Sequence, residues 1–402
     1  MLRLPFLEKA SSDENRFLSI NINAKDVRCL AFYFDGNVFK IVGSGKTNLP
    51  ENAVRNGVVL DKDIVTQALK NAVEKATEDL GGKLNRAIVG LDGGETLGLA
   101  TTIRLKRPTN GPIQKEEVEE LYSKITEASY IQAHNKVMQI TGNPETELEI
   151  ITTSEIYLKV EGRSVEVLEG QRGENVEACV YNAFSPSYHI RSLQKLIKKA
   201  GLSLIAIGSQ MYTLVEWLKL PPKELSDFVV ISVAEDSTDV GVVFGGGIIS
   251  TKTLNIGYLH FIDSIKTTMG LSRNEVENIL ETYNLGNLTT SETSVVKNCL
   301  SEPIKIWVSG LKLLFEDFSG VKTFAPKICL TGCGSQIPDI FEAVKKEEWT
   351  KTVPFKAHPE FSKISLSDIQ KVVDSTDKIK TDDWLYMYAA PIIYKEIYGS
   401  QI

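Results

Sequence analysis

Apolar residues in this chain gather in short runs typical of β-strands, separated by stretches with helical spacing. Asp35-Gly36-Asn37 is a hairpin signal within the first group of strands. That group is predicted at residues 17–22, 27–34 and 38–43. A helix follows residues 56–61 and ends at Gly81-Gly82. Its apolar stripe comprises Ile64, Ala68, Leu69, Ala72, Val73 and Ala76. A short strand is then expected at residues 86–91.

The same order of elements returns in the second half of the chain. Pro221-Pro222 marks the boundary, because two prolines break a helix and stiffen the join. Three strands are predicted after it, at residues 228–233, 240–244 and 248–255. Helices follow, one of them opened by the capping box Ser272-Arg-Asn-Glu275 and one spanning about residues 290–319, before a strand at residues 327–330. We therefore expect two similar α/β lobes that close on a cleft.

A change in composition within the first half, from about Gly93 to Gly170, predicts an insertion with its own small sheet. It contains a charged helix at residues 114–133, a strand at residues 147–160 and loops rich in Gly, Asn, Pro and Glu. The core pattern returns at residues 175–181 and continues as helix, strand and helix through Trp217. We divide the chain into a first lobe (residues 16–92 plus 171–220), an inserted subdomain (residues 93–170) and a second lobe (residues 221–402).

Composition narrows the class of protein. The 402 residues are enough for two or more domains, and 42% hydrophobic with 24% charged residues is ordinary for a globular chain. A net charge of −7 argues against a nucleic-acid partner. No apolar run reaches the length of about 18 residues that a membrane-spanning helix needs. Five scattered cysteines suit reduced thiols in a cytoplasm. The four histidines are isolated, so we expect no metal site.

The turn after the first strand of the second half is the most informative segment for function. A turn in this position could cradle phosphates if it were built of glycines. Here it reads Ala234-Glu235-Asp236. Each unpaired carboxylate about 4 Å from a phosphate would cost roughly 1–4 kcal/mol. Side chains also block the close backbone approach that glycine permits. The layout of a nucleotide clamp is therefore expected without its chemistry.

Four local motifs carry a resemblance to a known family. They are Gly57-Val-Val-Leu-Asp61, the segment from Asn182 to Leu193, Leu330-Thr-Gly-Cys-Gly-Ser-Gln-Ile-Pro338, and Asp382-Asp-Trp384 with the apolar helix after it. These motifs resemble the bacterial cell-division protein FtsA, a member of the actin-like ATPase superfamily, and the resemblance runs from about Phe17 to Tyr398. It implies an α/β, two-lobed actin-like fold of the duplicated ribonuclease-H-like type. Residues 93–170 would correspond to the inserted α+β subdomain called 1C, or SHS2.

The resemblance also implies where a nucleotide would bind. The family's positions fall at Thr331, Gly332, Gly334, Ser335, Thr238, Asp239 and Gln210. Family residues are replaced at several points: the first phosphate loop, D-x-G-[TS], reads Asn21-Ile-Asn-Ala24, and Gln210 stands for the glutamate between the lobes. Further replacements are Tyr258 and Cys333 for glycines and Leu280 for a lysine. Phosphoryl transfer rests on metal and backbone positioning. We therefore expect a vestigial cleft, no catalytic residues, and at most weak binding of ATP or ADP.

In function, the resemblance implies a pseudo-ATPase scaffold of bacterial cell division. It would link a FtsZ-type filament to other proteins of the divisome, self-associate into filaments, and use residues 272–320 to contact FtsZ. Its location would be the cytoplasm, at the inner face of the membrane or the division site. FtsA proteins usually carry a basic amphipathic helix beyond the last helix, whereas this sequence stops at Ile402. Membrane contact is therefore expected to be indirect or weak, or to use residues 1–7.

Two alternatives remain open at this point. PilM, a relative in pilus assembly, has the same layout, so the chain could be a PilM-like adaptor. Such an adaptor would grip a short peptide of a membrane protein between the first lobe and the insertion. The third interpretation is an active ATPase with atypical ligands.

Overall fold

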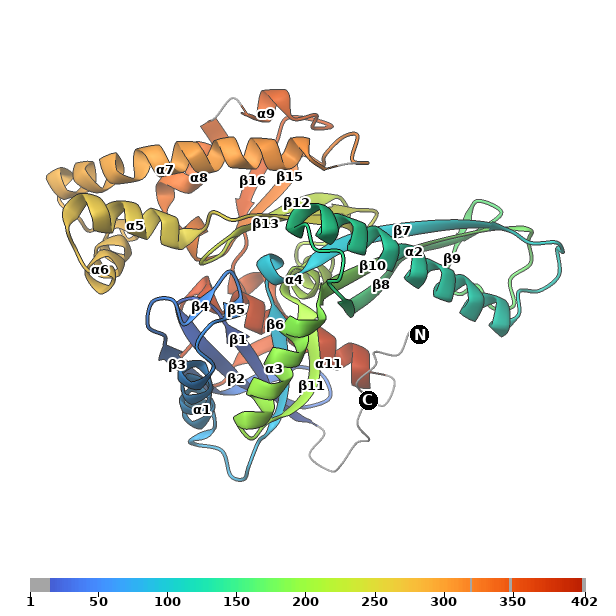
Figure 1. Cartoon of the computed structure of the whole chain (residues 1–402), viewed down its shortest axis with the longest axis horizontal. Helices are drawn as coiled ribbons and strands as arrows, with labels where there is room; N and C mark the ends of the chain where they lie inside the picture. The colour runs from blue at the N-terminus through green and yellow to red at the C-terminus, as the bar shows by residue number, and fades with distance from the viewer. Residues whose placement is uncertain (1–14, 319, 347–348, 400–402) are drawn as a thin grey trace.

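The structure, a computed structural model, describes residues 15–318, 320–346 and 349–399. Figure 1 shows two lobes, one above the other, and an elongated arm that extends to one side. Residues 1–7, a candidate for membrane contact, lie outside the described residues. Within the described ranges, none of the helices combines the length and the hydropathy that crossing a bilayer requires.

The first lobe is built on a six-stranded sheet that starts from an antiparallel meander. The meander comprises β1 (Arg16–Ile22), β2 (Asp26–Phe34) and β3 (Phe39–Asn48). Two strands extend it in parallel beside β1, namely β6 (Arg86–Leu91) and then β11 (Ser203–Ser209). β17 (Val372–Asp374) pairs with β3 at the other edge. Residues on both faces of β2 are buried, which explains its nearly continuous apolar sequence.

The second lobe repeats this arrangement. Its meander comprises β12 (Phe228–Val233), β13 (Thr238–Phe244) and β14 (Gly247–Leu254). β15 (Lys327–Thr331) pairs in parallel with β12, and β16 (Glu360–Lys363) pairs in parallel with β15. Each of these pairings has its counterpart in the first sheet. The predicted α/β, two-lobed fold with a duplicated core is confirmed.

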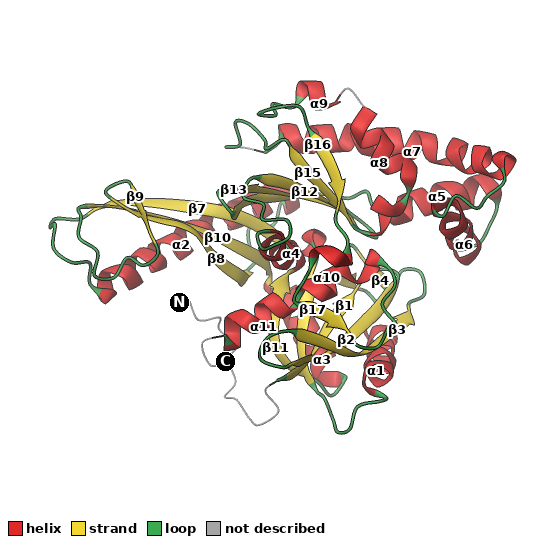
Figure 2. Cartoon of the chain, turned by 180° about the vertical axis from the view of Figure 1, so that it is seen from behind, coloured by secondary structure: helices red, strands yellow, loops and turns green. Residues whose placement is uncertain are grey.

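Helices cover the sheets of both lobes (Figure 2). Those of the first half are α1 (Lys62–Thr77), α3 (Ser187–Lys199) and α4 (Gln210–Leu218), with the short β4 (Val54–Arg55) and β5 (Val58–Val59) before α1. Those of the second half are α5 (Tyr258–Met269), α6 (Arg273–Asn284), α7 (Thr290–Glu316), α8 (Pro338–Lys346) and α9 (Trp349–Thr352). One large apolar cluster joins the first lobe to one face of the second sheet, where it includes Phe228, Val230 and Cys329, and a second cluster lies between the other face of that sheet and the helices of the second half. The two lobes therefore share part of one apolar core.

The arm is a continuation of the second sheet. β7 (Leu97–Lys106), β10 (Asn175–Pro186), β8 (Leu148–Val160) and β9 (Arg163–Val165) follow β14 in that order, which makes nine strands. α2 (Lys115–Thr141) lies along the arm (Figure 1). The expected division places β10 in the first lobe, but β10 pairs with β7 and β8. The pairing buries Val176 and Ala178 in a cluster with Leu121 and Ile125 of α2.

The last two helices of the chain also lie on a different lobe from the one expected. α10 (Leu385–Ala389) and α11 (Pro391–Tyr398), assigned to the second lobe, pack on the first. The ring of Tyr394 stacks on that of Phe17 with centroids 4.6 Å apart, and Trp217 Nε1 donates to the carbonyl of Ala389 at 2.9 Å. These buried contacts, and not the position of α10 and α11 in the sequence, determine which lobe the two helices pack on. The exact lobe boundaries remain a proposal.

Two local expectations were wrong. Ile64 is 41% exposed, whereas Val65 is fully buried. The side chain of Asp61 accepts hydrogen bonds from the amides of Asp63 and Ile64, so Ile64 lies in the first helical turn. β3 does not stop at Gly43 but runs on to Asn48.

Candidate functional site: a closed cleft between the lobes

Two tight turns, one from each lobe, face one another across the cleft. The β1–β2 turn lies at residues 23–25, and the β12–β13 turn lies at residues 234–237. With the loop after β15 and the start of α4, they line a cavity of about 30 Å³, whose walls also include Asp92, Asp382, Asp383 and Tyr386. Of the residues predicted for a nucleotide site, Gln210, Thr331 and Gly332 line this cavity. The structure therefore brings these three residues together, and their role with a ligand stays a prediction.

The other four predicted residues do not line the cavity. Thr238 Oγ1 donates to the carbonyl of Ile256 at 2.7 Å and accepts from Trp307 Nε1 at 2.8 Å. Ser335 Oγ donates to the carbonyl of Gly332 at 2.7 Å. Gly334 lies against Val233, where an added Cβ would overlap that side chain. These contacts hold the loops themselves.

Asp239 is the fourth of these residues, and it joins the second lobe to the start of the arm. Its carboxylate accepts from the amide of Gly93 at 3.0 Å and from Thr253 Oγ1 at 2.7 Å. Burial raises the pKa of Asp239 to about 6, against the lowering effect of those two donors. A carboxylate held in this way is a structural acceptor rather than a free metal ligand.

The β1–β2 turn is closed by its own side chain. Asn23 Oδ1 accepts hydrogen bonds from the amide of Lys25 at 2.9 Å and from the amide of Asp26 at 2.8 Å. In a phosphate-binding turn such amides point at the anion. Here the side-chain oxygen of Asn23 takes the place that a phosphate oxygen would need.

A buried arginine, Arg28, lines the cavity. Its Nε donates to Asp26 Oδ1 at 2.7 Å, its Nη2 donates to Asp26 Oδ2 at 3.0 Å, and its Nη1 donates to the carbonyl of Asp383. Nη2 also lies 3.8 Å from Glu235 Oε1 of the opposite lobe. The guanidinium stacks over the ring of Trp384, 5.6 Å from its centroid. Side-chain exposure is 4% for Arg28 and 0% for Asp26.

The pKa shifts in this network follow from burial and from the arginine. Burial alone would raise the pKa of Asp26, but Arg28 and Lys46 hold that pKa below its usual value. Burial raises the pKa of Glu235 to about 6, although Arg28 pulls it down. The charge of Arg28 is therefore already balanced inside the protein by Asp26 and partly by Glu235.

Further polar contacts join the two lobes around the cavity. Lys25 of the first lobe lies 3.1 Å from Glu277 of α6, and Lys266 of α5 lies 2.8 Å from Glu51. The amide of Asn56 donates to Asp236 Oδ2 at 2.8 Å. The expectation of two unpaired carboxylates in the β12–β13 turn was therefore wrong. The two side chains diverge, Glu235 toward Arg28 and Asp236 toward the β4–β5 hairpin.

A magnesium nucleotide does not fit these residues in this arrangement. Small-molecule pockets usually measure about 300–1,000 Å³, far more than this cavity offers. Tyr258 is buried and has the ammonium of Lys25 over its ring, so the place of a family glycine is filled. Within the described ranges, no three His, Cys, Asp or Glu side chains are grouped to hold a metal.

Sequence reasoning missed Arg28, which connects the walls of the cleft. One signal was present, because Arg28 is the only charged residue in the apolar run at residues 27–34. A charge in such a run needs a buried partner. Nothing in the sequence indicated that one partner would be the carbonyl of Asp383, which lies 355 positions away.

Comparison with known proteins first defines the class. No protein-family model matches the chain. A structure of the PilM–PilN type IV pilus biogenesis complex has a TM-score of 0.65 at 14% identity, over 94% of this chain and 98% of that one. The ethanolamine utilization protein EutJ from Carboxydothermus hydrogenoformans has a TM-score of 0.50 at 11% identity, over 93% of this chain and 88% of that one. The chain has the actin-like fold.

Within that class, the chain is similar in sequence to the cell-division protein FtsA of Bacillus subtilis. The identity is 22% over 273 residues, which cover 65% of this chain and 57% of that relative. The predicted resemblance to FtsA is thereby confirmed as a distant one. The matched part spans less than two thirds of the length of the relative.

Proposed function

We propose that the chain is an FtsA-like scaffold of bacterial cell division with a nucleotide cleft that has lost its ligand. It would connect a FtsZ-type filament to other division proteins at the cytoplasmic face of the membrane, with membrane contact through a partner. The similarity to FtsA supports the role in division, and the Arg28 network is the observation that carries the loss of the ligand. Arg28, Asp26 and Glu235 provide across the cleft the opposite charges that a metal and a phosphate chain would otherwise provide. The two lobes thus have contacts of their own and need no nucleotide between them.

A nucleotide titration tests the loss of the ligand. We expect ATP and ADP, with or without Mg²⁺, to leave the thermal unfolding midpoint unchanged. A specific ligand at 100 times its Kd would add about 2.7 kcal/mol to the free energy of unfolding. Stabilisation that depends on Mg²⁺ and disappears in a Thr331→Ala variant would contradict the proposal and favour the ATPase interpretation.

A co-pelleting assay tests the partner. We expect polymerised FtsZ to carry the protein into the pellet. Ile306 and Leu313 are 54% and 65% exposed and lie seven positions apart on α7, on one face of that helix. A double change, Ile306→Asn with Leu313→Asn, should abolish pelleting. The control is Ile140→Asn on α2, where the side chain is 79% exposed.

One other outcome would favour the PilM-like adaptor, whose fold matches with a TM-score of 0.65. If FtsZ leaves the protein in solution while a cytoplasmic peptide of an inner-membrane pilus protein binds it, the adaptor replaces the scaffold. Pelleting that persists in the α7 double variant would count against residues 272–320 as the contact surface.

A further inference from the structure

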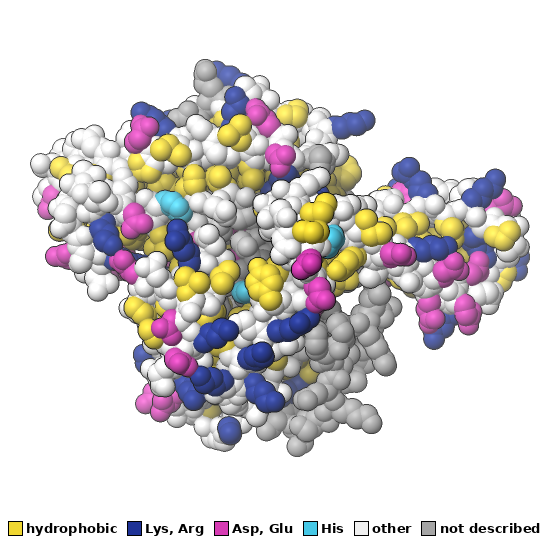
Figure 3. All heavy atoms as spheres, viewed as in Figure 1, with side chains coloured by type: hydrophobic (Ala, Val, Ile, Leu, Met, Phe, Trp, Pro, Cys, Tyr) yellow, Lys and Arg dark blue, Asp and Glu magenta, His cyan; other side chains and the backbone are white. Residues whose placement is uncertain are grey.

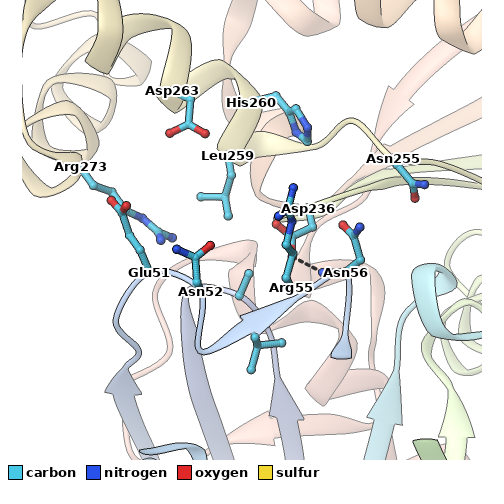
Figure 4. Close-up of a pocket in the computed structure, with 12 residues that line it drawn as sticks. Glu51, Asn52, Arg55, Asn56, Asp236, Asn255, Leu259, His260, Asp263 and Arg273 are labelled. Carbon is cyan, nitrogen blue, oxygen red and sulfur yellow. Dashed lines mark hydrogen bonds between the residues drawn. The ribbon is translucent and has the colours of Figure 1, made fainter. Parts of the chain in front are cut away.

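A second, larger cavity lies at the mouth of the cleft, outside the site described above. Its volume is about 390 Å³, within the usual range for small-molecule sites. The β4–β5 hairpin of the first lobe forms one wall, and α5 and the start of α6 form the other (Figure 4). Figure 3 shows the same side of the whole molecule, where basic and acidic side chains both gather near the gap between the lobes.

The basic groups of this cavity are incompletely satisfied. Arg273 Nε donates to Glu277 at 3.1 Å, but Arg273 Nη2 is buried and has no acceptor among the described residues. The side chain of Arg273 is only 15% exposed. Arg55 lies beside Asp236 in Figure 4, and its charge opposes the rise that burial causes in the pKa of Asp236. His260 Nδ1 accepts from the amide of Gly257 at 3.1 Å, so the neutral ring carries its proton on Nε2 and can donate it.

Acidic side chains line the same cavity as these donors. Asp263 of α5 lines the cavity and has no basic partner within ion-pair distance among the described residues. Asp236 accepts one hydrogen bond, from the amide of Asn56. Glu51 is already neutralised by Lys266 at 2.8 Å. Figure 4 shows Asp263 and Arg273 directed toward one space above Asn52.

This distribution of charge selects the class of ligand. A simple anion would gain from Arg55 and Arg273 but would be repelled by Asp236 and Asp263. A simple cation would be attracted by Asp236 and Asp263 but repelled by Arg55 and Arg273. A small molecule with both charges satisfies both sets, since its oxyanion can pair with a guanidinium and its ammonium with a carboxylate.

We infer that the cavity binds a small zwitterion of the α-amino-acid type between the two lobes. Its carboxylate lies at Arg273, and its ammonium lies at Asp263. Because the walls belong to different lobes, the bound molecule adds contacts across the mouth of the cleft. The inference does not depend on FtsZ or on the loss of the nucleotide.

The test is a titration of the purified full chain with each standard L-amino acid, followed by calorimetry and thermal unfolding. Inorganic phosphate and malate serve as anion probes, and ethylamine as a cation probe. We expect one or more amino acids to bind, and Arg273→Gln and Asp263→Asn each to weaken that binding about tenfold or more. Arg191→Gln on α3, where the side chain is 61% exposed, is the matched control and should not change affinity.

Three results would overturn the inference. The first is that no amino acid binds the unaltered protein. The second is that phosphate or malate binds and Asp263→Asn strengthens the binding, which would make the cavity an anion site. The third is that amino acids bind equally well to the Arg273 and Asp263 variants. FtsZ pelleting measured on the same variants separates failure of this site from failure of the proposed function.

Discussion

Replacing Arg28 with methionine should lower the free energy of unfolding by about 3–5 kcal/mol, the usual result of removing one partner of a buried ion pair. The side chain of Asp26 is 0% exposed and accepts two hydrogen bonds from the guanidinium. Methionine fills a similar volume but leaves that carboxylate buried with Lys46 as its remaining basic partner, 3.2 Å away. Glu235 loses its neighbour at the same time. Chemical denaturation measures the change.

The dependence on pH identifies the cause of that loss. In the native protein, Arg28 and Lys46 hold the pKa of Asp26 low against the effect of burial, so the stabilisation is present above the unfolded pKa. In the variant burial dominates, and the folded pKa rises above the unfolded one. The deficit should therefore shrink as the pH falls from about 8 to about 5. A deficit that does not vary with pH would indicate lost packing instead.

Two further variants control the experiment. Adding Asp26→Asn to Arg28→Met removes the stranded charge and should restore a large part of the stability. Arg104→Met removes an arginine whose side chain is 78% exposed and which pairs with Glu177 at 2.8 Å. That loss should not exceed about 1 kcal/mol. Equal losses for Arg28→Met and Arg104→Met would mean that the cleft network does not stabilise the fold.

The sequence predicted the two repeated lobes because a strand that is buried on both faces has a continuous apolar sequence, which can be recognised without knowing its neighbours. β12 is buried at every position, and the meander after Pro221-Pro222 could be read from apolar runs and turn residues alone. The sequence does not show which other strands a given strand will pair with. The run containing β10 has the same apolar character whether it joins the first lobe or the arm, so only the long register with β7 and β8 decides its place. The contact between α11 and Phe17 likewise cannot be predicted from the local sequence pattern.

The candidate site was predictable to a similar extent. The resemblance to the family placed Gln210, Thr331 and Gly332 in one cleft, and in the structure all three line one cavity, at or directly after the ends of β11 and β15. What fills the cleft could not be predicted. Glu235 and Asp236 are adjacent and chemically alike, yet one faces Arg28 and the other accepts from Asn56. The direction of each side chain depends on residues brought near by the whole fold.

Gly45 in β3 is the second position where a single change should have a large effect. A Cβ added at Gly45 would overlap the backbone carbonyl oxygen of Ala72 in α1, and one added at Gly43 would overlap that of Ala76. α1 therefore packs backbone against backbone on β3, and this close approach requires the glycines that β3 carries at and beyond the end predicted at Gly43. A helix carbonyl cannot turn aside as a side chain can. Gly45→Ala should lower the free energy of unfolding by about 3 kcal/mol.

Gly81→Ala is the matched control, because a Cβ there meets no atom within 4 Å. Alanine restricts the unfolded chain, so this variant should keep or slightly exceed the original stability, by about 0.4–1 kcal/mol. Denaturant titration compares the two, and the slope with denaturant should be the same for both if only the native contact changes. If Gly45→Ala were as stable as Gly81→Ala, α1 would not lie in backbone contact with β3. The sheet that positions Asn23 and Arg28 would then be packed less tightly against α1 than in the structure.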